Sequence, residues 1–114
     1  MSTSALIAYE NEDGTYDVNC INFDGYVEGV GKTLQNYWND SEKAKFLCHA
    51  NEIRSLEATV DETEFYGVSL AILKKRKNIS FDKLCNEAGN FDYTYVYEDD
   101  MWQQLSEREI IEPY

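Results

Sequence analysis

The sequence predicts a single α+β domain over residues 1–114: an antiparallel sheet of about four strands, made of two terminal hairpins and packed on one face by two to four short helices. Two observations point to this fold. Strand-like runs of apolar or alternating apolar and polar residues lie near both ends of the chain, and stretches with helical periodicity lie between them. The length suits one domain with its own core, and the single proline, Pro113, leaves no proline-rich linker to divide it.

The first hairpin is predicted near the N-terminus. Residues 5–9 form an apolar run typical of a buried strand, and residues 16–23 alternate as a return strand does. Residues 11–15 supply the turn between them. Within it, Asp13-Gly14 is a strong hairpin signal, because these residue types tolerate the left-handed backbone that tight turns need.

The middle of the chain is predicted to be mostly helical. An apolar stripe predicts a helix from about Val27 to Trp38, and Ser41 is expected to cap a second helix that ends near Ala50. Residues 52–56 are interpreted as a short connection anchored in the core. Residues 61–73 fit either a loose helix or an extended segment, and both interpretations stay open.

The second hairpin is predicted near the C-terminus. It follows a short helix that Ser80 is expected to cap and Gly89 to close. An aromatic residue then occupies every second position from Phe91 to Tyr97, and residues 101–105 return as the partner strand. The aromatic stripe is interpreted as the floor of the core rather than a base-stacking surface, because this strand carries no basic residue.

The charge is large and unevenly distributed. Twenty-two acidic residues oppose ten Lys and Arg, which gives a formal net charge of −12. Residues 1–31 hold six acidic residues and no Lys or Arg, and residues 91–114 hold seven acidic residues and one Arg. Such a surface repels DNA, RNA and anionic lipid and attracts basic grooves. The alternative to a binding surface is that the charge serves only to keep the protein soluble.

No pattern predicts a catalytic residue, a metal site or a cofactor. Residues 25–33 resemble a phosphate-binding loop, but the spacing from Gly25 to Gly31-Lys32-Thr33 is one residue too long. Cys48 and His49 are helix neighbours, so their side chains project about 100° apart and cannot form a dyad. The basic run at residues 74–77 is interpreted as a solvated loop or as a partner of the acidic ends.

The cysteines and the N-terminus suggest a compartment. The three cysteines are widely spaced with no CxxC pair, and free thiols suit a reducing cytoplasm. The first residues lack a basic leader region, and no apolar run approaches the ~18 residues of a membrane span. A soluble intracellular protein is expected.

The candidate binding residues are therefore acidic. If the two hairpins lie in one sheet, their carboxylates would be spaced about 5–7 Å apart, close to the spacing of phosphates along a nucleic-acid strand. The expected partner-binding residues are Glu10, Glu12, Asp13, Asp17, Asp92, Glu98, Asp99 and Asp100. Such a face would occupy a basic nucleic-acid channel and compete for it.

Several stretches of the chain resemble a group of small, mostly uncharacterised phage and prophage proteins. The stretches that carry the resemblance are residues 5–16, 24–34, 42–44, 52–56, 61–67 and 93–102. The chain departs from the family pattern at Asn22-Phe23, where the family often has His-Trp, and over residues 68–77. The missing His counts against an enzymatic role. The resemblance implies a phage or mobile-element origin and a bacterial cytoplasm.

Origin and charge together predict a phage-encoded inhibitor of a host defence system, of the anti-CRISPR or anti-restriction kind. Its expected partner is a host protein or ribonucleoprotein complex with a basic nucleic-acid-binding groove, which the acidic face would enter as a DNA mimic. Direct binding to nucleic acid or membrane is not expected. The sequence does not decide between a monomer and a homodimer. The alternatives are a non-inhibitory accessory or regulatory phage protein and a nucleotide-binding protein that uses residues 25–33.

Overall fold

The predicted sheet is wrong in its size and in its direction of pairing. The computed structural model describes residues 3–67, 77–105 and, for the backbone alone, 109–110. Over these residues seven strands form one mixed sheet in the order β4-β3-β2-β1-β5-β6-β7. The strands are β1 (Ala5–Glu10), β2 (Tyr16–Ile21), β3 (Ile53–Ser55), β4 (Glu64–Phe65), β5 (Tyr93–Glu98), β6 (Met101–Gln104) and β7 (Glu109–Ile110).

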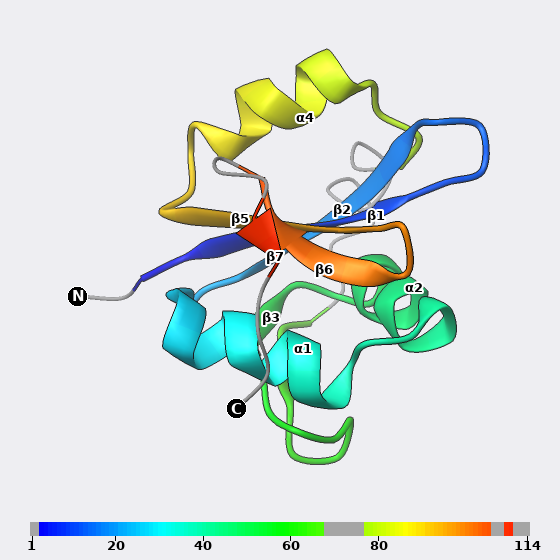
Figure 1. Ribbon diagram of the computed structural model, residues 1–114. Coiled ribbons are helices and arrows are strands. Elements are labelled where there is room, and N and C mark those ends of the chain that lie inside the picture. The colour runs from blue at the N-terminus through cyan, green and yellow to red at the C-terminus, as the bar shows by residue number, and fades with distance from the viewer. Residues whose placement is uncertain (1–2, 68–76, 106–108, 111–114) are drawn as a thin grey trace.

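Parallel pairing joins the two hairpins at the centre of the sheet. β1 pairs with β2, and β5 with β6, as antiparallel hairpins, but β1 lies parallel to β5 in the register Ala5↔Tyr93 to Tyr9↔Tyr97. β2 also pairs in parallel with β3 at Ile21↔Ile53. β5 follows helix α4 (Phe81–Ala88), which returns the chain to the end of the sheet where β1 begins, so the two strands run the same way (Figure 1).

The remaining helices begin and end close to the predicted positions. The helix expected from Val27 to Trp38 is a π-helical turn, η1 (Val27–Gly31), followed by α1 (Lys32–Tyr37). Helix α2 spans Ser41–His49. Its cap is Asp40 rather than the expected Ser41, because the Asp40 carboxylate accepts from the Lys43 N–H at 2.8 Å.

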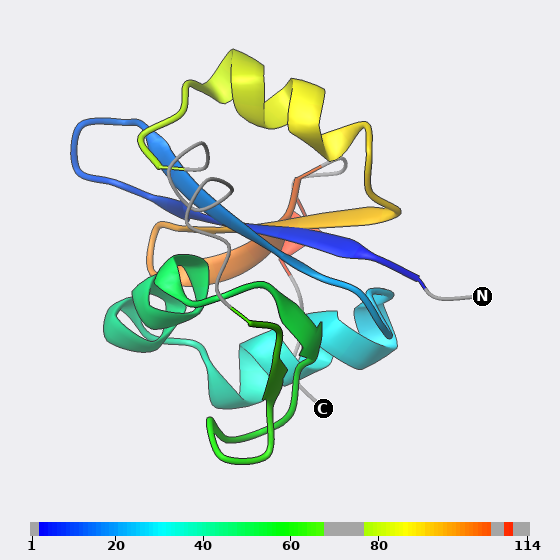
Figure 2. The same ribbon diagram turned by 180° about the vertical axis from the view of Figure 1, so that it is seen from behind.

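Helices cover both faces of the sheet, where the sequence predicted one covered face. Helices α1 and α2 lie on one side and α4 on the other (Figures 1 and 2). On the α1 and α2 side Leu34 and Leu47 are buried against Ile7 and Tyr95. On the opposite side Leu84 of α4 is buried with the alternate residues of the same strands. β1 and β5 are therefore apolar on both faces, as central strands of a covered sheet must be.

The aromatic stripe of β5 is the floor of the core beneath α1. Tyr95 is fully buried, and its hydroxyl donates to the Gly25 carbonyl at 2.6 Å. The Trp102 indole N–H donates to the Trp38 carbonyl at 3.0 Å, which ties β6 to the end of α1. These buried polar groups are each satisfied by a backbone carbonyl, one in the segment after β2 and one at the end of α1.

Candidate functional site

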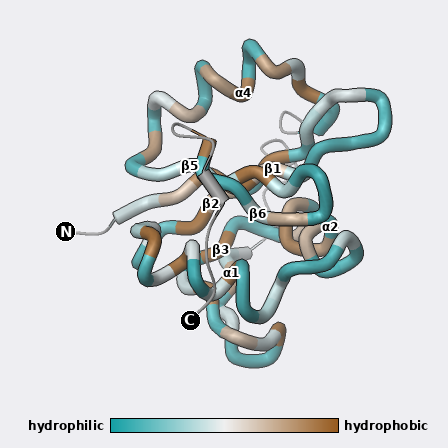
Figure 3. The backbone as a smooth tube through the Cα atoms, in the orientation of Figure 1, coloured by the Kyte–Doolittle hydropathy of each residue, from teal (hydrophilic) through white to brown (hydrophobic). Residues whose placement is uncertain are grey.

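Two acidic turns meet at one end of the sheet. Because β1 and β5 are parallel and in register, their C-terminal ends coincide, and the β1–β2 and β5–β6 turns project from the same end (Figures 1 and 2). Hydrophilic residues occupy much of both turns (Figure 3). Six of the eight predicted binding residues lie at this end: Glu10, Glu12, Asp13, Glu98, Asp99 and Asp100. Glu98, unlike the turn residues, is buried, with 7% of its surface exposed.

A seventh carboxylate, Asp40, joins this end from the start of α2. The Tyr9 hydroxyl lies 2.8 Å from Ser41 Oγ, which fastens α2 to the end of β1. Burial raises the pKa of Tyr97, and the nearby charges of Asp100 and then Asp40 raise it further. Both carboxylates therefore lie close to this one ring. We call the six residues above together with Asp40 the acidic end.

The β5–β6 turn carries two adjacent carboxylates on a left-handed backbone. Asp99 has φ 53° and Asp100 has φ 61°, and they separate the last paired residues, Glu98 and Met101. Positive φ at both central positions defines the type I′ hairpin turn, for which Asn-Gly is the favoured sequence. Asp tolerates this conformation less well than Gly. Asp-Asp thus holds two exposed negative charges side by side where a neutral turn would be more stable.

The β1–β2 turn fixes its own carboxylate by local hydrogen bonds. Gly14 has φ 86° and donates to the Asn11 carbonyl at 3.0 Å, while the Asn11 N–H donates to Thr15 at 2.7 Å. The Thr15 hydroxyl and N–H donate to Asp13 Oδ1 at 2.6 and 2.9 Å. These bonds, the hydroxyl's first, lower the pKa of Asp13. Asp13 is therefore an oriented, ionised acceptor on the surface.

Asp17 is buried within the fold and is not exposed at this end. It is 4% exposed, and its Oδ2 lies 2.5 Å from Nε2 of His49 at the end of α2. Its Oδ1 accepts from the Asn78 N–H at 2.8 Å and from Asn11 Nδ2 at 3.0 Å. Burial by itself would raise the pKa of Asp17, but these hydrogen bonds and the His49 charge together lower it. Asp17 joins α2, the first turn and residue 78.

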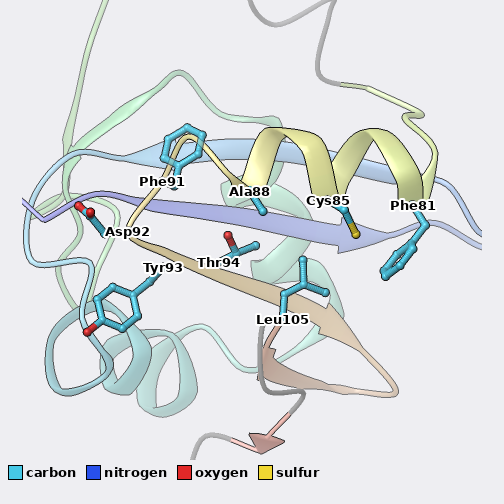
Figure 4. Close-up of a pocket in the computed structure, with 8 residues that line it drawn as sticks. All are labelled: Phe81, Cys85, Ala88, Phe91, Asp92, Tyr93, Thr94 and Leu105. Carbon is cyan, nitrogen blue, oxygen red and sulfur yellow. The ribbon is translucent and has the colours of Figure 1, made fainter.

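Asp92 lies at the opposite end of the sheet. It precedes β5 where β1 begins, and its Oδ2 accepts from the Ser4 N–H at 2.9 Å and from Ser4 Oγ at 3.3 Å. Figure 4 shows Asp92 and Tyr93 at one end of a cavity beneath α4. This cavity has a volume of about 520 Å³ and is walled by apolar side chains such as Phe91 and Leu105. Asp92 is therefore separated from the acidic end by the length of β5.

Three N–H groups of the glycine loop at residues 25–33 donate to backbone carbonyls. The Gly25 N–H donates to the Thr3 carbonyl at 2.9 Å, the Val30 N–H to Asp24 at 2.8 Å and the Gly29 N–H to Tyr26 at 3.0 Å. A Cβ on Gly25 would lie 2.6 Å from the Ser4 backbone, so this glycine permits close packing. These N–H groups are already committed to carbonyls, whereas a phosphate cradle needs them directed outward.

Cys48 is buried, and only part of the basic run lies within the described residues. Cys48 is 2% exposed, and burial, followed by the charge of Asp17, raises the pKa of its thiol well above the usual value. In the part of the chain that the structure describes, no three His, Cys, Asp or Glu side chains are arranged to hold a metal ion. Of the basic run, Lys77 is exposed beside Asn78, and residues 74–76 lie outside the described residues.

The chemistry of the acidic end is that of a multivalent anion. Its carboxylates come from three segments, and Glu12, Asp13, Asp40, Asp99 and Asp100 are exposed. Exposed carboxylates accept hydrogen bonds from Lys and Arg side chains. Sequence reasoning missed Asp40; its acidity next to the predicted start of a helix was the available signal.

None of the helices described here, over residues 3–67 and 77–105, is long and apolar enough to cross a membrane. Comparison of the chain with protein-family models, with curated proteins and with solved structures finds no match.

Proposed function

We propose that this protein is a phage-encoded inhibitor of a host defence system, which uses its acidic end to occupy a basic nucleic-acid-binding groove. The observation that carries the proposal is the Asp99-Asp100 turn, where two exposed like charges adopt a left-handed backbone that Asn-Gly would adopt more readily. Backbone strain that the fold does not need is a feature of functional positions. The phage origin rests on the resemblance of the chain to phage and prophage proteins.

The position of the charges supports a groove-shaped partner. The exposed acidic residues lie on two turns and a helix start, and the two turns are at the same end of the sheet (Figures 1 and 2). A protruding anionic end can enter a channel lined by Lys and Arg, where low-dielectric walls strengthen each contact. The partner would be a protein or ribonucleoprotein complex in the bacterial cytoplasm. Asp17 and Asp92 are not part of this revised binding site.

A competition experiment tests the proposal. Purified CRISPR effector and restriction complexes are offered labelled DNA with and without the protein, from about 50 to 200 mM salt. We expect one complex to lose DNA, with the affinity of the inhibitor falling at least about tenfold over this range, because charge contacts are screened. Displacement that is insensitive to salt would contradict an electrostatic mechanism, and displacement of no complex would favour an accessory protein whose acidity serves solubility.

Charge reversal locates the binding surface within that experiment. Asp99→Lys with Asp100→Lys should abolish displacement of DNA. Asp82→Lys with Glu87→Lys makes the same change of charge on α4, on the other side of the sheet, and serves as the matched control. Equal loss in both variants would mean that net charge, rather than the acidic end, drives binding.

A further inference from the structure

A second surface lies beside the acidic end, at the junction of α1, α2 and the segment that follows β3. A cavity of about 340 Å³ opens there, walled by Tyr37 and Trp38 at the end of α1, Phe46 of α2 and Val60. Tyr37, Phe46 and Val60 are 52%, 46% and 47% exposed. They are three of the six large apolar side chains that are exposed among the described residues. We call this cavity the aromatic groove.

The floor of the aromatic groove is rigid. Trp38 is 3% exposed, and its indole N–H donates to the Glu57 carbonyl at 2.9 Å. Its ring stacks on Phe46, with centroids 6.4 Å apart and planes within 7°. A preformed apolar site binds more tightly than one that must be ordered, because little conformational entropy is lost on binding.

The wall around Val60 is held by its own hydrogen bonds. Thr63 Oγ1 donates to the Thr59 carbonyl at 2.7 Å and accepts from the Glu57 N–H at 3.0 Å. The Glu62 N–H donates to Thr59 Oγ1 at 3.3 Å. Val60 therefore lies on a turn that these hydrogen bonds hold in place, with its side chain exposed to solvent.

The rim of the groove is negatively charged. Glu42 and Lys43 line the groove. The positive charge of Lys43 is offset by Asp40, whose carboxylate lies 3.8 Å from Lys43 Nζ. In the two segments that supply the lining residues, 37–46 and 57–62, exposed acidic residues outnumber exposed lysines: Asp40, Glu42, Glu57, Asp61 and Glu62 against Lys43 and Lys45. A second copy of this chain carries the same net charge of −12, so like-charge repulsion opposes self-association through the groove.

We propose that the aromatic groove receives an aliphatic or aromatic side chain from a Lys- and Arg-rich face of a protein partner. The cavity is at the small end of ligand sites, which suits one or two large side chains. Asp40 belongs both to the acidic end and to this rim, so one partner can contact both. This inference rests on the proposed function and adds to it the apolar anchor that tight interfaces place beside their charged contacts.

Designed peptides test the groove directly. The first probe is a ten-residue peptide with Leu-Phe at its centre and four Lys or Arg on each side; the second replaces Leu-Phe by Ser-Ser, and the third replaces the basic flanks by Glu. Binding is followed by NMR through the indole N–H signals of Trp38 and Trp102. We expect the basic Leu-Phe peptide to bind at least about tenfold more tightly than either of the others, with the larger shift at Trp38.

Two variants assign that binding to the groove. In the double variant Phe46→Ser with Val60→Ser, the affinity for the basic Leu-Phe peptide should fall to that for the Ser-Ser peptide. Phe81→Ser, which removes a side chain 45% exposed on α4, should leave the tenfold preference intact. Equal affinity of the basic Leu-Phe and Ser-Ser peptides, or of the basic and acidic Leu-Phe peptides, would overturn the inference. A dimer in sedimentation that Phe46→Ser dissociates would also overturn it.

The same titration separates this inference from the proposed function. With Asp99→Asn and Asp100→Gly in place, a tenfold Leu-Phe preference that survives supports the groove, whatever becomes of DNA displacement. DNA displacement that depends on Asp99 and Asp100, without any Leu-Phe preference, would support the acidic end and overturn the groove.

Discussion

Asp17 and the Asp99-Asp100 turn hold the same chemical group in opposite environments. Asp17 is buried and receives hydrogen bonds from three separate segments, so its charge is used within the fold. Asp99 and Asp100 are exposed on a left-handed turn, where two like charges lie side by side. Under the proposed function, the carboxylates therefore have two roles. One carboxylate joins the structure together, and the exposed ones are available to a partner.

The largest expected effect is the loss of the buried carboxylate. Asp17→Ala removes the acceptor of Asn78, Asn11 and His49 and leaves these groups without their partner. We expect the free energy of unfolding to fall by about 3 kcal/mol, as when one member of a buried pair is removed. Urea denaturation followed by tryptophan fluorescence measures it. A fall of less than about 0.5 kcal/mol, the range of ordinary surface substitutions, would mean that Asp17 contributes no more to stability than an exposed carboxylate does.

The pH dependence of stability sharpens this comparison. The pKa of Asp17 is lower in the folded chain than its ordinary value of 3.8, so the folded state favours its ionised form. Its stabilisation is therefore complete above about pH 5 and is lost as the pH falls through the folded pKa. We expect the stability difference between the wild type and Asp17→Asn to shrink between about pH 5 and 2. A difference that grows on acidification would mean that the shift has the opposite sign.

The strained turn should respond in the opposite direction. Asp99→Asn with Asp100→Gly supplies the sequence that a type I′ turn favours and removes two like charges. We expect a gain of about 1 kcal/mol in the free energy of unfolding and a rise of about 4 °C in Tm. Differential scanning calorimetry measures both. Destabilisation would show that Asp99 and Asp100 contribute to the fold, as Asp17 does.

The smallest expected effect is at the far end of the sheet. Asp92→Ala removes the acceptor of Ser4 at an exposed position, and we expect a loss of about 0.5 kcal/mol in the free energy of unfolding. DNA displacement by this variant should equal that of the wild type. Loss of displacement would extend the binding surface along β5 and weaken the distinction between the two ends.

Local patterns predicted the elements better than their arrangement. Asp13-Gly14 and the alternation from Phe91 to Tyr97 marked the hairpins because a turn and its flanking strands are encoded within a few residues. The parallel pairing of β1 with β5 depends on where α4 returns the chain, which no local pattern encodes. β3 and β4 have three and two residues, too few for a period to show.

The candidate site was partly predictable for the same reason. The acidic residues of the two turns were identified because each turn is a local feature, and parallel pairing then brought them to one end. Asp17 was expected on the surface, since a charged strand residue is usually solvated. Its partners come from α2, the first turn and residue 78, which only the tertiary fold brings together. Asp40 joins the site through the contact between Tyr9 and Ser41, which is also tertiary.

The most direct test of the central claim measures stability and inhibition in one variant, Asp99→Asn with Asp100→Gly. Bacteria that express the wild type and carry the defence system whose complex is displaced should be infected by a targeted phage at high plating efficiency. The variant should have a higher Tm and yet restore immunity, because its turn is relaxed and its charges are gone. Full inhibition by this more stable variant would contradict the claim that the acidic end binds the partner.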